Sequence, residues 1–366
     1  MENFLADLLP ALQAQGVSCK ALVHAHGRAS VTESSQVAGV EVIRVPSYGR
    51  LLYVPVSPAF PLWLERAIAR LRPDLLHLHL PNASALWALA LPSARKIPWV
   101  VHWHSDVVPS RLDWRLRLAY PLYRPFEQAV LARARKIIVT SPAYLEASQP
   151  LAPWRAKCSV VPLGLDESRY PMPTDEAARW AEQQWHGSRL RILTVGRMTY
   201  YKGHETLIRA MVDCPGLSLI LVGGGEREAA LAALVAQLGL SSRVKLIGRL
   251  PDDKMQALLA GCDVFCLPSV ERTEAFGMVL LEAMRYGRPL LVSDIAGSGV
   301  GWVVGDNACG LKVAPGNAAE LAAGLGRLAA EPALRANMGA EGRRRFERQF
   351  NIANIAEAIA GIYSAL

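Results

Sequence analysis

Short runs of apolar residues alternate with segments of helical periodicity along almost the whole chain. In the first half, these runs predict strands at residues 19–26, 41–46, 74–81, 98–106, 136–142 and 157–165. In the second half, they predict strands at 190–197, 217–225, 244–250, 264–269 and 289–295, with amphipathic helices between them. Such alternation is typical of parallel α/β sheets that carry helices on both faces. We therefore predict an α/β protein with two Rossmann-like domains, joined near the proline-containing stretch 162–188.

Length and composition agree with this division and exclude several other classes of protein. A chain of 366 residues is long enough for two domains, and half of its residues are apolar. No run of about 18 uncharged apolar residues predicts a membrane-spanning helix. No basic region followed by an apolar core predicts a secretory signal, so we expect a cytoplasmic protein. Its six cysteines are scattered, which favours buried free thiols over a metal site.

The excess of positive charge belongs entirely to the first half of the chain. Residues 1–165 contain 18 Lys and Arg against 10 Asp and Glu, a difference of 8 that equals the net charge of the whole chain. The excess is largest in residues 111–136, where aromatic and leucine side chains lie between the arginines. This pattern fits contact with an anionic membrane surface, and also a solvated helix face with long basic side chains. Nucleic acid is the third interpretation, but no nucleic-acid-binding motif supports it.

Polar residues follow the predicted strands of the second half at the edge where such sheets bind ligands. Arg197 and Lys202 come directly after strand 190–197, in a loop that also contains Gly196 and Gly203. Two cations at this spacing can bind a diphosphate from two sides, although surface charges would look the same. The glycines at 223–225 follow the next strand, but no phosphate-loop lysine follows them.

The segment 264–287 predicts a buried strand, a loop and then a helix that begins near Gly277. The unpaired N–H groups and partial positive charge of a helix start can hold a phosphate, and glycine lets a ligand approach the backbone. Glu274 precedes the helix and could accept hydrogen bonds from sugar hydroxyls, whereas Glu282 lies nearly two turns inside it and could reach a ribose. Taken singly, each is better explained as a capping or surface carboxylate.

The order of these motifs changes that balance. An R-x4-K pair follows one strand and an E-x7-E pair follows a later strand of the same predicted domain. Here the sequence resembles the retaining glycosyltransferases of GT-B architecture, of the group 1 or GT4 type. The resemblance covers essentially the whole chain and rests on VGRMTYYKG, LVGGGE, VKLIGRL, DVFCLPSVERTEAFGMVLLEAMRYGRPLLVSDIAGSG and GLKVAPGN, with DLLHLHLPN, VHWHSD, TSPAYLEAS and VVPLGLD in the first half.

The resemblance implies transfer of a hexose from a GDP- or UDP-linked sugar to an acceptor hydroxyl, with the anomeric configuration kept. Arg197 and Lys202 would neutralise the diphosphate leaving group, so that no metal or other cofactor is needed. Glu274 would hold the donor sugar and Glu282 the ribose, while His104 would touch the donor sugar from the first domain. The donor-binding set implied by the resemblance is Gly196, Gly223, Gly248, Arg249, Ala275, Phe276, Gly277, Met278 and Glu282, with the base resting near Ile247.

Two pairs of alternating histidines lie at strand ends of the first half. The resemblance favours His104 over His102 for the active site. His79 and Asn82 lie near the carboxyl end of the preceding predicted strand, where an acceptor or donor could contact them, and we assign them to the acceptor side. For each histidine, a satisfied buried side chain is the other interpretation, and no His, Cys or Asp spacing predicts a metal site. The acceptor would be a glycan or lipid-linked glycan in surface polysaccharide or lipopolysaccharide synthesis, with the protein peripheral on the inner face of the membrane. No nucleic-acid partner is expected.

The family pattern also implies domain boundaries and one departure. We expect a first domain over 1–165, a nucleotide-sugar domain over 166–345, and a final helix over 346–366 that returns to the first domain, with Ile355, Ile359 and Ile362 facing inward. Family members usually begin with a short strand and a glycine-rich loop. This chain begins instead with residues 1–17, which we interpret as the helix that follows that loop. That departure keeps two alternatives open: a GT-B nucleotide-sugar epimerase, and a catalytically silent sugar-nucleotide-binding subunit.

Overall fold

The computed structural model describes residues 2–25, 31–51, 54–107, 114–185 and 187–366. Contacts within the chain divide it into two compact units. Unit 1 comprises Met1–Pro162 and Ile352–Leu366, and unit 2 comprises Leu163–Asn351. The boundaries therefore lie a few residues from the predicted 165 and 346. The reason is local, because the Leu165 amide donates to the carbonyl of Phe350 at 3.0 Å and Leu165 forms a parallel bridge with Asn351.

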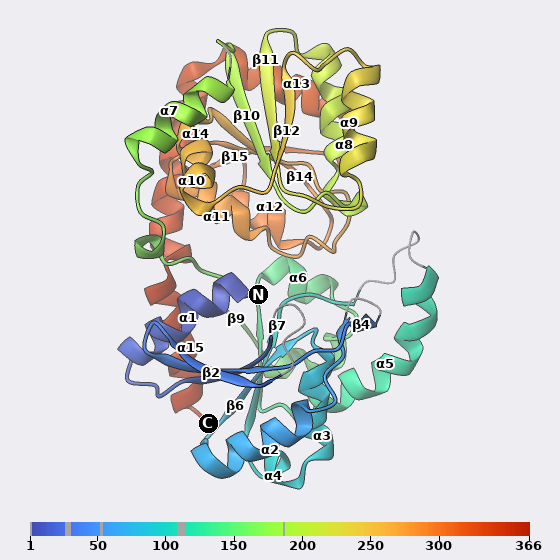
Figure 1. The fold of residues 1–366 in the computed structure, drawn as a ribbon, viewed down its shortest axis with the longest axis vertical. Helices are drawn as coiled ribbons and strands as arrows, with labels where there is room; N and C mark the ends of the chain where they lie inside the picture. Colours follow the sequence, from blue (N-terminus) through green and yellow to red (C-terminus); the bar gives the residue numbers. More distant parts are fainter. Residues whose placement is uncertain (1, 26–30, 52–53, 108–113, 186) are drawn as a thin grey trace. The chain divides into compact units, whose positions relative to one another are not determined.

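Unit 2 is built on one parallel sheet, whose strand order is β12-β11-β10-β13-β14-β15 (Figure 1). The strands are β10 (Leu190–Val195), β11 (Leu217–Val222), β12 (Val244–Gly248), β13 (Val264–Leu267), β14 (Leu290–Ser293) and β15 (Gly310–Val313). The helices are α7 (Asp175–Gln184), α8 (His204–Ala210), α9 (Glu228–Gln237), α10 (Asp252–Gly261), α11 (Met278–Arg285), α12 (Gly299–Val304), α13 (Ala318–Ala330) and α14 (Pro332–Arg345). Single helical turns are η3 (Glu167–Arg169), η4 (Tyr200–Lys202) and η5 (Met211–Asp213), and the π-helical turn η6 (Phe346–Phe350) follows α14.

The core of unit 2 follows from the alternation of side chains along each strand. Ile192 on β10, Leu219 on β11 and Cys266 on β13 belong to one buried cluster with side chains of α8, α9 and α13. The intervening strand residues, such as Leu193 and Phe265, are equally buried on the other face of the sheet. Because both faces are covered, the strands read as continuous apolar runs, which is why the sequence predicts them.

Unit 1 contains parallel strands in two sheets within the described residues, with orders β1-β3-β2 and β6-β7-β8-β9, and a short β4-β5 hairpin. The strands are β1 (Lys20–His24), β2 (Glu33–Val37), β3 (Val40–Val45), β4 (Arg50–Leu51), β5 (Val54–Pro55), β6 (Leu76–Leu80), β7 (Trp99–Trp103), β8 (Lys136–Val139) and β9 (Cys158–Val160). The helices are α1 (Glu2–Ala14), α2 (Phe60–Leu71), α3 (Trp87–Ala90), α4 (Pro92–Arg95), α5 (Trp114–Arg133), α6 (Pro142–Ala147) and α15 (Ile352–Ser364), with single turns η1 (Ala83–Leu86) and η2 (Ala152–Lys157). β2 pairs antiparallel with β3, and the remaining pairs in these two sheets are parallel.

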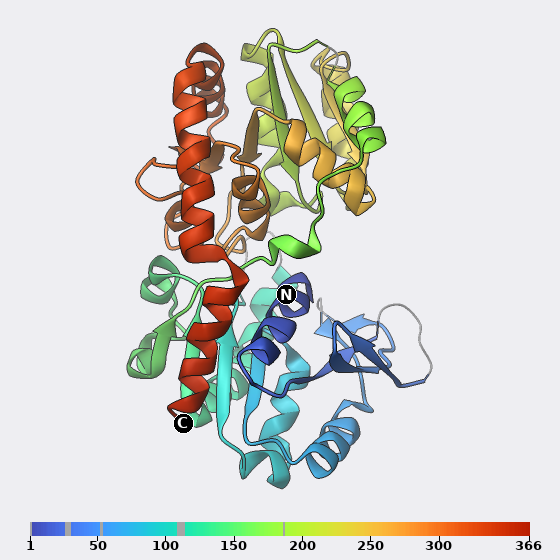
Figure 2. The same ribbon diagram turned by 90° about the vertical axis from the view of Figure 1, so that its left-hand side faces the viewer.

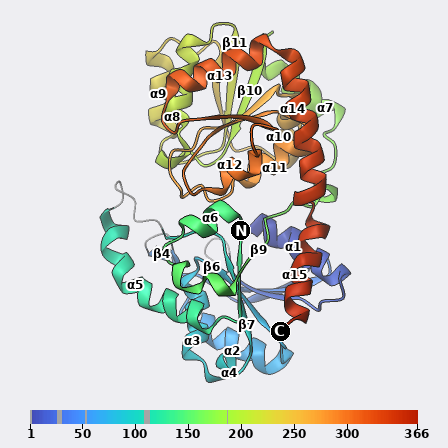
Figure 3. The same cartoon turned by 180° about the vertical axis from the view of Figure 1, so that it is seen from behind.

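The first and last helices of the chain pack together in unit 1. α1 and α15 lie side by side, as Figures 2 and 3 show from two directions. Ile355 and Ile359 on α15 are buried, as the helical spacing predicts, whereas Ile362 is half-buried. The segment 346–366 is not one continuous helix, because it is interrupted at Asn351 between η6 and α15.

The cysteines are free thiols, as predicted. Cys158 is half-buried and the other five are buried, and burial raises the pKa of Cys262 to about 12. A thiol with so high a pKa is neither a good nucleophile nor a ready metal ligand.

Candidate functional site

Two loops meet at the carboxyl ends of the central strands of unit 2. β10 and β13 are neighbours in the sheet, so the loops that leave them at residues 196–203 and 268–277 run next to each other. The amide of Val270 donates to the carbonyl of Tyr201 at 2.8 Å. A Cβ atom on Gly203 would lie 1.9 Å from the carbonyl oxygen of Pro268. Only glycine allows this approach, which fixes one loop against the other.

A buried ion pair joins the two loops. The Nζ atom of Lys202 lies 2.6 Å from Oε2 of Glu274, and their side chains are only 12% and 11% exposed. Ser269 donates its hydroxyl to the same carboxylate oxygen at 3.0 Å. A carboxylate and an ammonium held this far from water are strong partners for a ligand that carries both hydroxyl groups and negative charge.

The protonation of Lys202 is set by two opposing influences. Burial is the larger single influence and would lower the pKa of the ammonium group. The charge of Glu274, Tyr201 and the hydrogen bond to Glu274 act in the opposite direction and together prevail, so the pKa of Lys202 lies above its ordinary value. Lys202 therefore carries a full positive charge throughout the neutral pH range.

The backbone around Glu274 is also held by the segment that leads from β14 into α12. Ser298, the N-cap residue of α12, donates its hydroxyl to the carbonyl of Glu274. The amide of Gly299 donates to the carbonyl of Ala275 at 2.8 Å. These bonds anchor the loop on both sides of the carboxylate, so that Glu274 keeps one position at the sheet edge. Ser298 is a functional residue that the predicted site lacks, although a serine directly before a helix start is a usual N-cap signal.

Gly277 is the N-cap residue of α11, as predicted from the sequence. Its φ of +79° lies in the left-handed region, and an added Cβ would come within 3.0 Å of Leu267 and Leu280. The preceding Phe276 is buried, with its ring centroid 6.1 Å from that of Phe350. This arrangement turns the chain sharply into α11, so that the first-turn amides and the positive end of the helix point toward the sheet edge.

The predicted glycines at the ends of β10 and β11 bring two strand ends into direct contact. A Cβ atom on Gly223, whose φ is +135°, would lie 2.0 Å from the carbonyl oxygen of Gly196. Gly223 donates its amide to the carbonyl of Gly248 at 2.8 Å, which links β12 to the same edge. At Gly196, an added Cβ would lie 3.3 Å from Nζ of Lys202. The lysine thus lies directly over the bare backbone of Gly196.

The remaining predicted donor residues lie around this centre with different exposure. Arg197 and Arg249 are exposed, and Arg249 approaches Gly224. Met278 and Glu282 on α11 are half-buried. The structure therefore brings Lys202, Glu274, the glycines and α11 to one edge of the sheet, and leaves the two arginines in contact with solvent, where a ligand could recruit them.

The candidate residues of unit 1 lie at the carboxyl ends of β6 and β7. His79 Nδ1 lies 2.9 Å from His104 Nε2, and both rings are half-buried. His102 and His104 lie on the same face of β7, with ring centroids 4.4 Å apart. Asn82 caps η1 by accepting the Ser84 amide at 3.0 Å. Burial lowers the pKa of His104 well below its ordinary value, so its ring is neutral at neutral pH.

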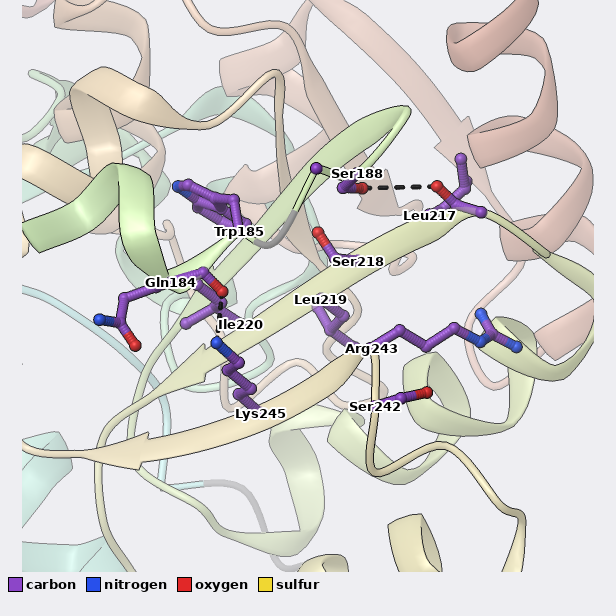
Figure 4. Close-up of a pocket in the computed structure, with 12 residues that line it drawn as sticks. Gln184, Trp185, Ser188, Leu217, Ser218, Leu219, Ile220, Ser242, Arg243 and Lys245 are labelled. Atoms are coloured by element: carbon purple, nitrogen blue, oxygen red, sulfur yellow. Dashed lines mark hydrogen bonds between the residues drawn. The ribbon is translucent and has the colours of Figure 1, made fainter. Parts of the chain in front are cut away.

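Figure 4 shows a different pocket of unit 2, lined by the amino-terminal half of β11 and the start of β12. Its cations already have backbone partners: Lys245 donates to the carbonyl of Gln184 at 2.5 Å, and Arg243 to that of Cys214 at 2.8 Å. This pocket is at the opposite end of the strands from the Lys202–Glu274 pair. Ligands of parallel sheets bind at the carboxyl ends, so we take the ion pair, and not this pocket, as the candidate site.

Comparison with known proteins points in the same direction. The family model described as glycosyl transferases group 1 matches residues 178–345, and the model of a glycosyl transferase 4-like domain matches residues 1–164. The O-antigen chain mannosyltransferase C of Escherichia coli is 31% identical over 323 residues, which are 87% of this chain and 83% of that protein.

Two solved structures share the fold over almost the whole chain. Sucrose-phosphate synthase from Thermosynechococcus elongatus superposes with a TM-score of 0.79 at 25% identity, covering 98% of this chain and 91% of that one. HepE of Anabaena, solved in complex with UDP-glucose, superposes with a TM-score of 0.77 at 22% identity, covering 99% and 95%. The predicted α/β fold of two Rossmann-like halves is thereby confirmed.

Proposed function

The chain belongs to the group 1 glycosyl transferases, and from that premise we propose that it moves a hexose, with retention of configuration, from a nucleoside-diphosphate sugar to a glycan or lipid-linked glycan. It is a glycosyltransferase, and the relatives described above give no support to the epimerase alternative. The observation that carries the proposal is the buried pair of Lys202 and Glu274 at the carboxyl edge of the sheet.

Departure of the nucleoside diphosphate is the step that Lys202 and Arg197 would assist. Negative charge grows on the leaving phosphate as the glycosidic bond lengthens, and fixed cations that are already in place stabilise that charge. Lys202 is buried and fully protonated, and exposed Arg197 lies at the start of the same loop. We propose that these two residues, aided by the start of α11, do the work for which other transferases use a metal ion.

Glu274 would bind the transferred sugar. Its carboxylate only accepts hydrogen bonds. A sugar hydroxyl group can therefore donate to it in place of Ser269, or alongside Lys202. The backbone amides of Ala275, Phe276 and Gly277 would serve sugar and phosphate oxygens. Glu282 is the fifth residue of α11, so it lies just over one turn from the helix start and not nearly two turns as expected. It would accept the ribose hydroxyls, and Gly248 with Arg249 would leave room for the base beside β12.

The acceptor side is assigned to unit 1 on the basis of the family resemblance. We propose that His104 touches the donor sugar near its reacting carbon, and that His79 and Asn82 serve the acceptor. A neutral His104 can donate or accept one hydrogen bond without adding charge, which suits contact with a sugar hydroxyl. The leaving phosphate would itself take the proton of the acceptor hydroxyl.

The donor and acceptor are proposed by analogy with relatives. The similarity to an O-antigen chain mannosyltransferase supports mannose as the transferred sugar and an O-antigen chain as the acceptor. We propose that the donor is GDP-linked mannose or a related deoxyhexose and that the acceptor belongs to lipopolysaccharide synthesis. The UDP-glucose complex of HepE keeps a UDP-hexose as the second candidate.

Nucleotide binding to the purified chain tests the donor site before any acceptor is known. We expect GDP to raise the melting temperature more than UDP or ADP, and Arg197→Ala to remove most of that rise. A ligand at about 100 times its Kd stabilises a protein by about 2.7 kcal/mol, which is readily measured. Arg327→Ala is the matched control, because Arg327 pairs with Glu331 on the exposed side of α13. A wild-type protein that melts cooperatively but responds to none of the three nucleotides would contradict the donor site.

A lipid-linked acceptor would place the enzyme at a membrane surface, and α5 has the character of such a contact. Leu118, Leu122 and Phe126 are 68%, 76% and 56% exposed, and their spacing of four residues puts them on one face of the helix. Exposed Arg117 and Arg124 lie among them. Residues 111–113 of the predicted basic segment lie outside the described residues. Among the described helices, none is both long and apolar enough to span a bilayer.

We propose that this face of α5 rests on anionic lipid, with leucine and phenylalanine in the interface and arginines on the headgroups. In flotation with vesicles containing phosphatidylglycerol, the wild-type chain should float at low salt. Leu122→Ser should weaken partitioning about tenfold, since burying one leucine is worth about 1.5–3 kcal/mol. Leu62→Ser on α2, where the side chain is 52% exposed, should change nothing. Equal partitioning of both variants, or no flotation of the wild type, would exclude this surface.

A further inference from the structure

Four histidines of unit 1 form one continuous group on one face of the sheet that contains β6 and β7. His77 and His79 alternate along β6, and His102 and His104 along β7 and its exit. His79 lies directly opposite His102 in the parallel register of the two strands. The ring centroids of His77 and His79 are 4.3 Å apart, those of His79 and His102 5.1 Å, and the four rings are stacked or tilted on one another. Of the four residues, His102 is buried and the other three are half-buried.

Several ring nitrogens of this group have no hydrogen-bond partner among the described residues. They are Nε2 of His77 and both ring nitrogens of His102, and all three are buried. A buried polar atom without a partner costs free energy, and most such atoms in native proteins are paired. One potential ligand atom from each of His77, His79 and His102 lies within 4.8 Å of the others. The unpaired nitrogens of His77 and His102, together with the short distance between the three rings, indicate an ion that the three rings could share.

The neighbours of the group match the second layer of a metal site. Nδ1 of His77 lies 2.5 Å from the hydroxyl oxygen of Tyr363 on α15, and Nδ1 of His79 lies 2.9 Å from Nε2 of His104. If Nε2 of His77 and His79 faces the ion, each Nδ1 carries the proton and donates to that neighbour. Ligating histidines almost always donate their second N–H in this way, which fixes the ring that binds the metal.

His77 and His79 are half-buried on β6, whereas His102 is buried on β7.

We propose that His77, His79 and His102 bind one divalent transition-metal ion, with zinc as the expected occupant. Three imidazoles suit zinc, nickel and copper ions, whereas magnesium and calcium prefer oxygen ligands. Coordination requires the stacked rings to turn so that their Nε2 atoms converge, with water completing a tetrahedral site. Such an ion would tie β6 to β7 and, through Tyr363, to α15, so its role is to stabilise unit 1. It would use His79, which is also proposed for the acceptor side, but it leaves the nucleotide-binding residues of unit 2 unchanged.

Metal binding by the full chain tests this proposal directly. The affinity tag should be removed and the protein treated with a chelator, because histidine tags bind the same ions. After addition of zinc chloride and desalting, we expect one zinc per chain by elemental analysis, and Co²⁺ should give the intense visible absorption of a tetrahedral site. His77→Gln and His102→Ala should each weaken zinc binding at least 100-fold. Two ligand variants are used because one of them could fail to fold, which a cooperative melting transition would reveal.

His24→Ala is the matched control, because His24 lies in unit 1 on β1 and packs against Phe60, with ring centroids 5.0 Å apart. It should bind zinc as the wild type does. The proposal is overturned if the wild type retains no zinc after desalting, or if folded ligand variants bind it as tightly as the control. GDP binding by the metal-free protein should be unchanged, so the outcome is independent of the function proposed for unit 2.

Discussion

Replacing Lys202 by methionine should lower kcat about 10²–10³-fold, the usual loss when one preorganised group that stabilises developing charge is removed. Lys202 is a buried cation whose pKa is raised by its partner, so it is charged at every pH where the enzyme would work. Methionine keeps the length of the side chain and its contact with Gly196 but removes the charge. The effect is measured as kcat and KM for the sugar nucleotide, because charge that matters only during bond breaking changes kcat more than KM.

The same substitution leaves Glu274 buried without its cation, so a loss of stability has to be separated from a loss of chemistry. Breaking a buried pair on one side costs about 3–5 kcal/mol, whereas replacing both partners by apolar residues is often neutral. The double variant Lys202→Met with Glu274→Leu should therefore recover stability in urea unfolding while remaining inactive. Lys245→Met, at the opposite end of the sheet, should keep kcat within about twofold. Near-normal kcat in folded Lys202→Met would contradict a role in departure of the diphosphate.

The sequence predicts the parts of this fold in which pattern and burial coincide. β10, β11 and β13 are covered on both faces, so each is a short apolar run with clear ends, and each lies within its predicted range. α11 is confirmed as well, since its apolar spacing follows the glycine at its start. Here local sequence and tertiary environment agree, and the carboxyl edge of the sheet could be named as the site of binding.

The strands that the sequence missed have no such signal. β2, with the sequence ESSQV, is exposed at every residue, so it shows no apolar alternation and is held by pairing with β3. β4 and β5 contain two residues each, and β15 contains four, with a glycine at its start. Strand propensity depends on neighbours more than on the residues themselves, which a single chain does not display.

Contacts between residues that lie far apart in the sequence could not be predicted either. Lys202 and Glu274 were both assigned to the donor, but with separate tasks, and the structure joins them directly. That contact depends on β10 lying next to β13, a strand order that the intervening sequence does not specify. The histidine group of unit 1 has the same origin, because the register between β6 and β7 places His79 opposite His102.

The direct pairing of the two residues leads to a second large effect, in Glu274→Gln. We expect kcat to fall about 10²–10³-fold, because glutamine cannot hold the sugar hydroxyls with a charge and the interaction is made most strongly in the transition state. GDP should nevertheless bind at least as tightly as to the wild type. In the ligand-free protein, the carboxylate of Glu274 is paired with the ammonium of Lys202, so a bound diphosphate has to compete with Glu274 for that cation. The neutral amide of glutamine removes this competition.

Measuring both quantities on one protein separates this account from general damage to the site. The GDP dissociation constant comes from calorimetry and kcat from product formation, and Glu205→Gln serves as control, since Glu205 pairs with Arg209 at 2.9 Å on the surface of α8. Loss of both GDP binding and turnover would mean that Glu274 chiefly positions Lys202 for the phosphate. Retained turnover would remove Glu274 from the sugar altogether. Only a fall in kcat with GDP affinity preserved or improved is consistent with a carboxylate that holds the sugar and yields the lysine to the diphosphate.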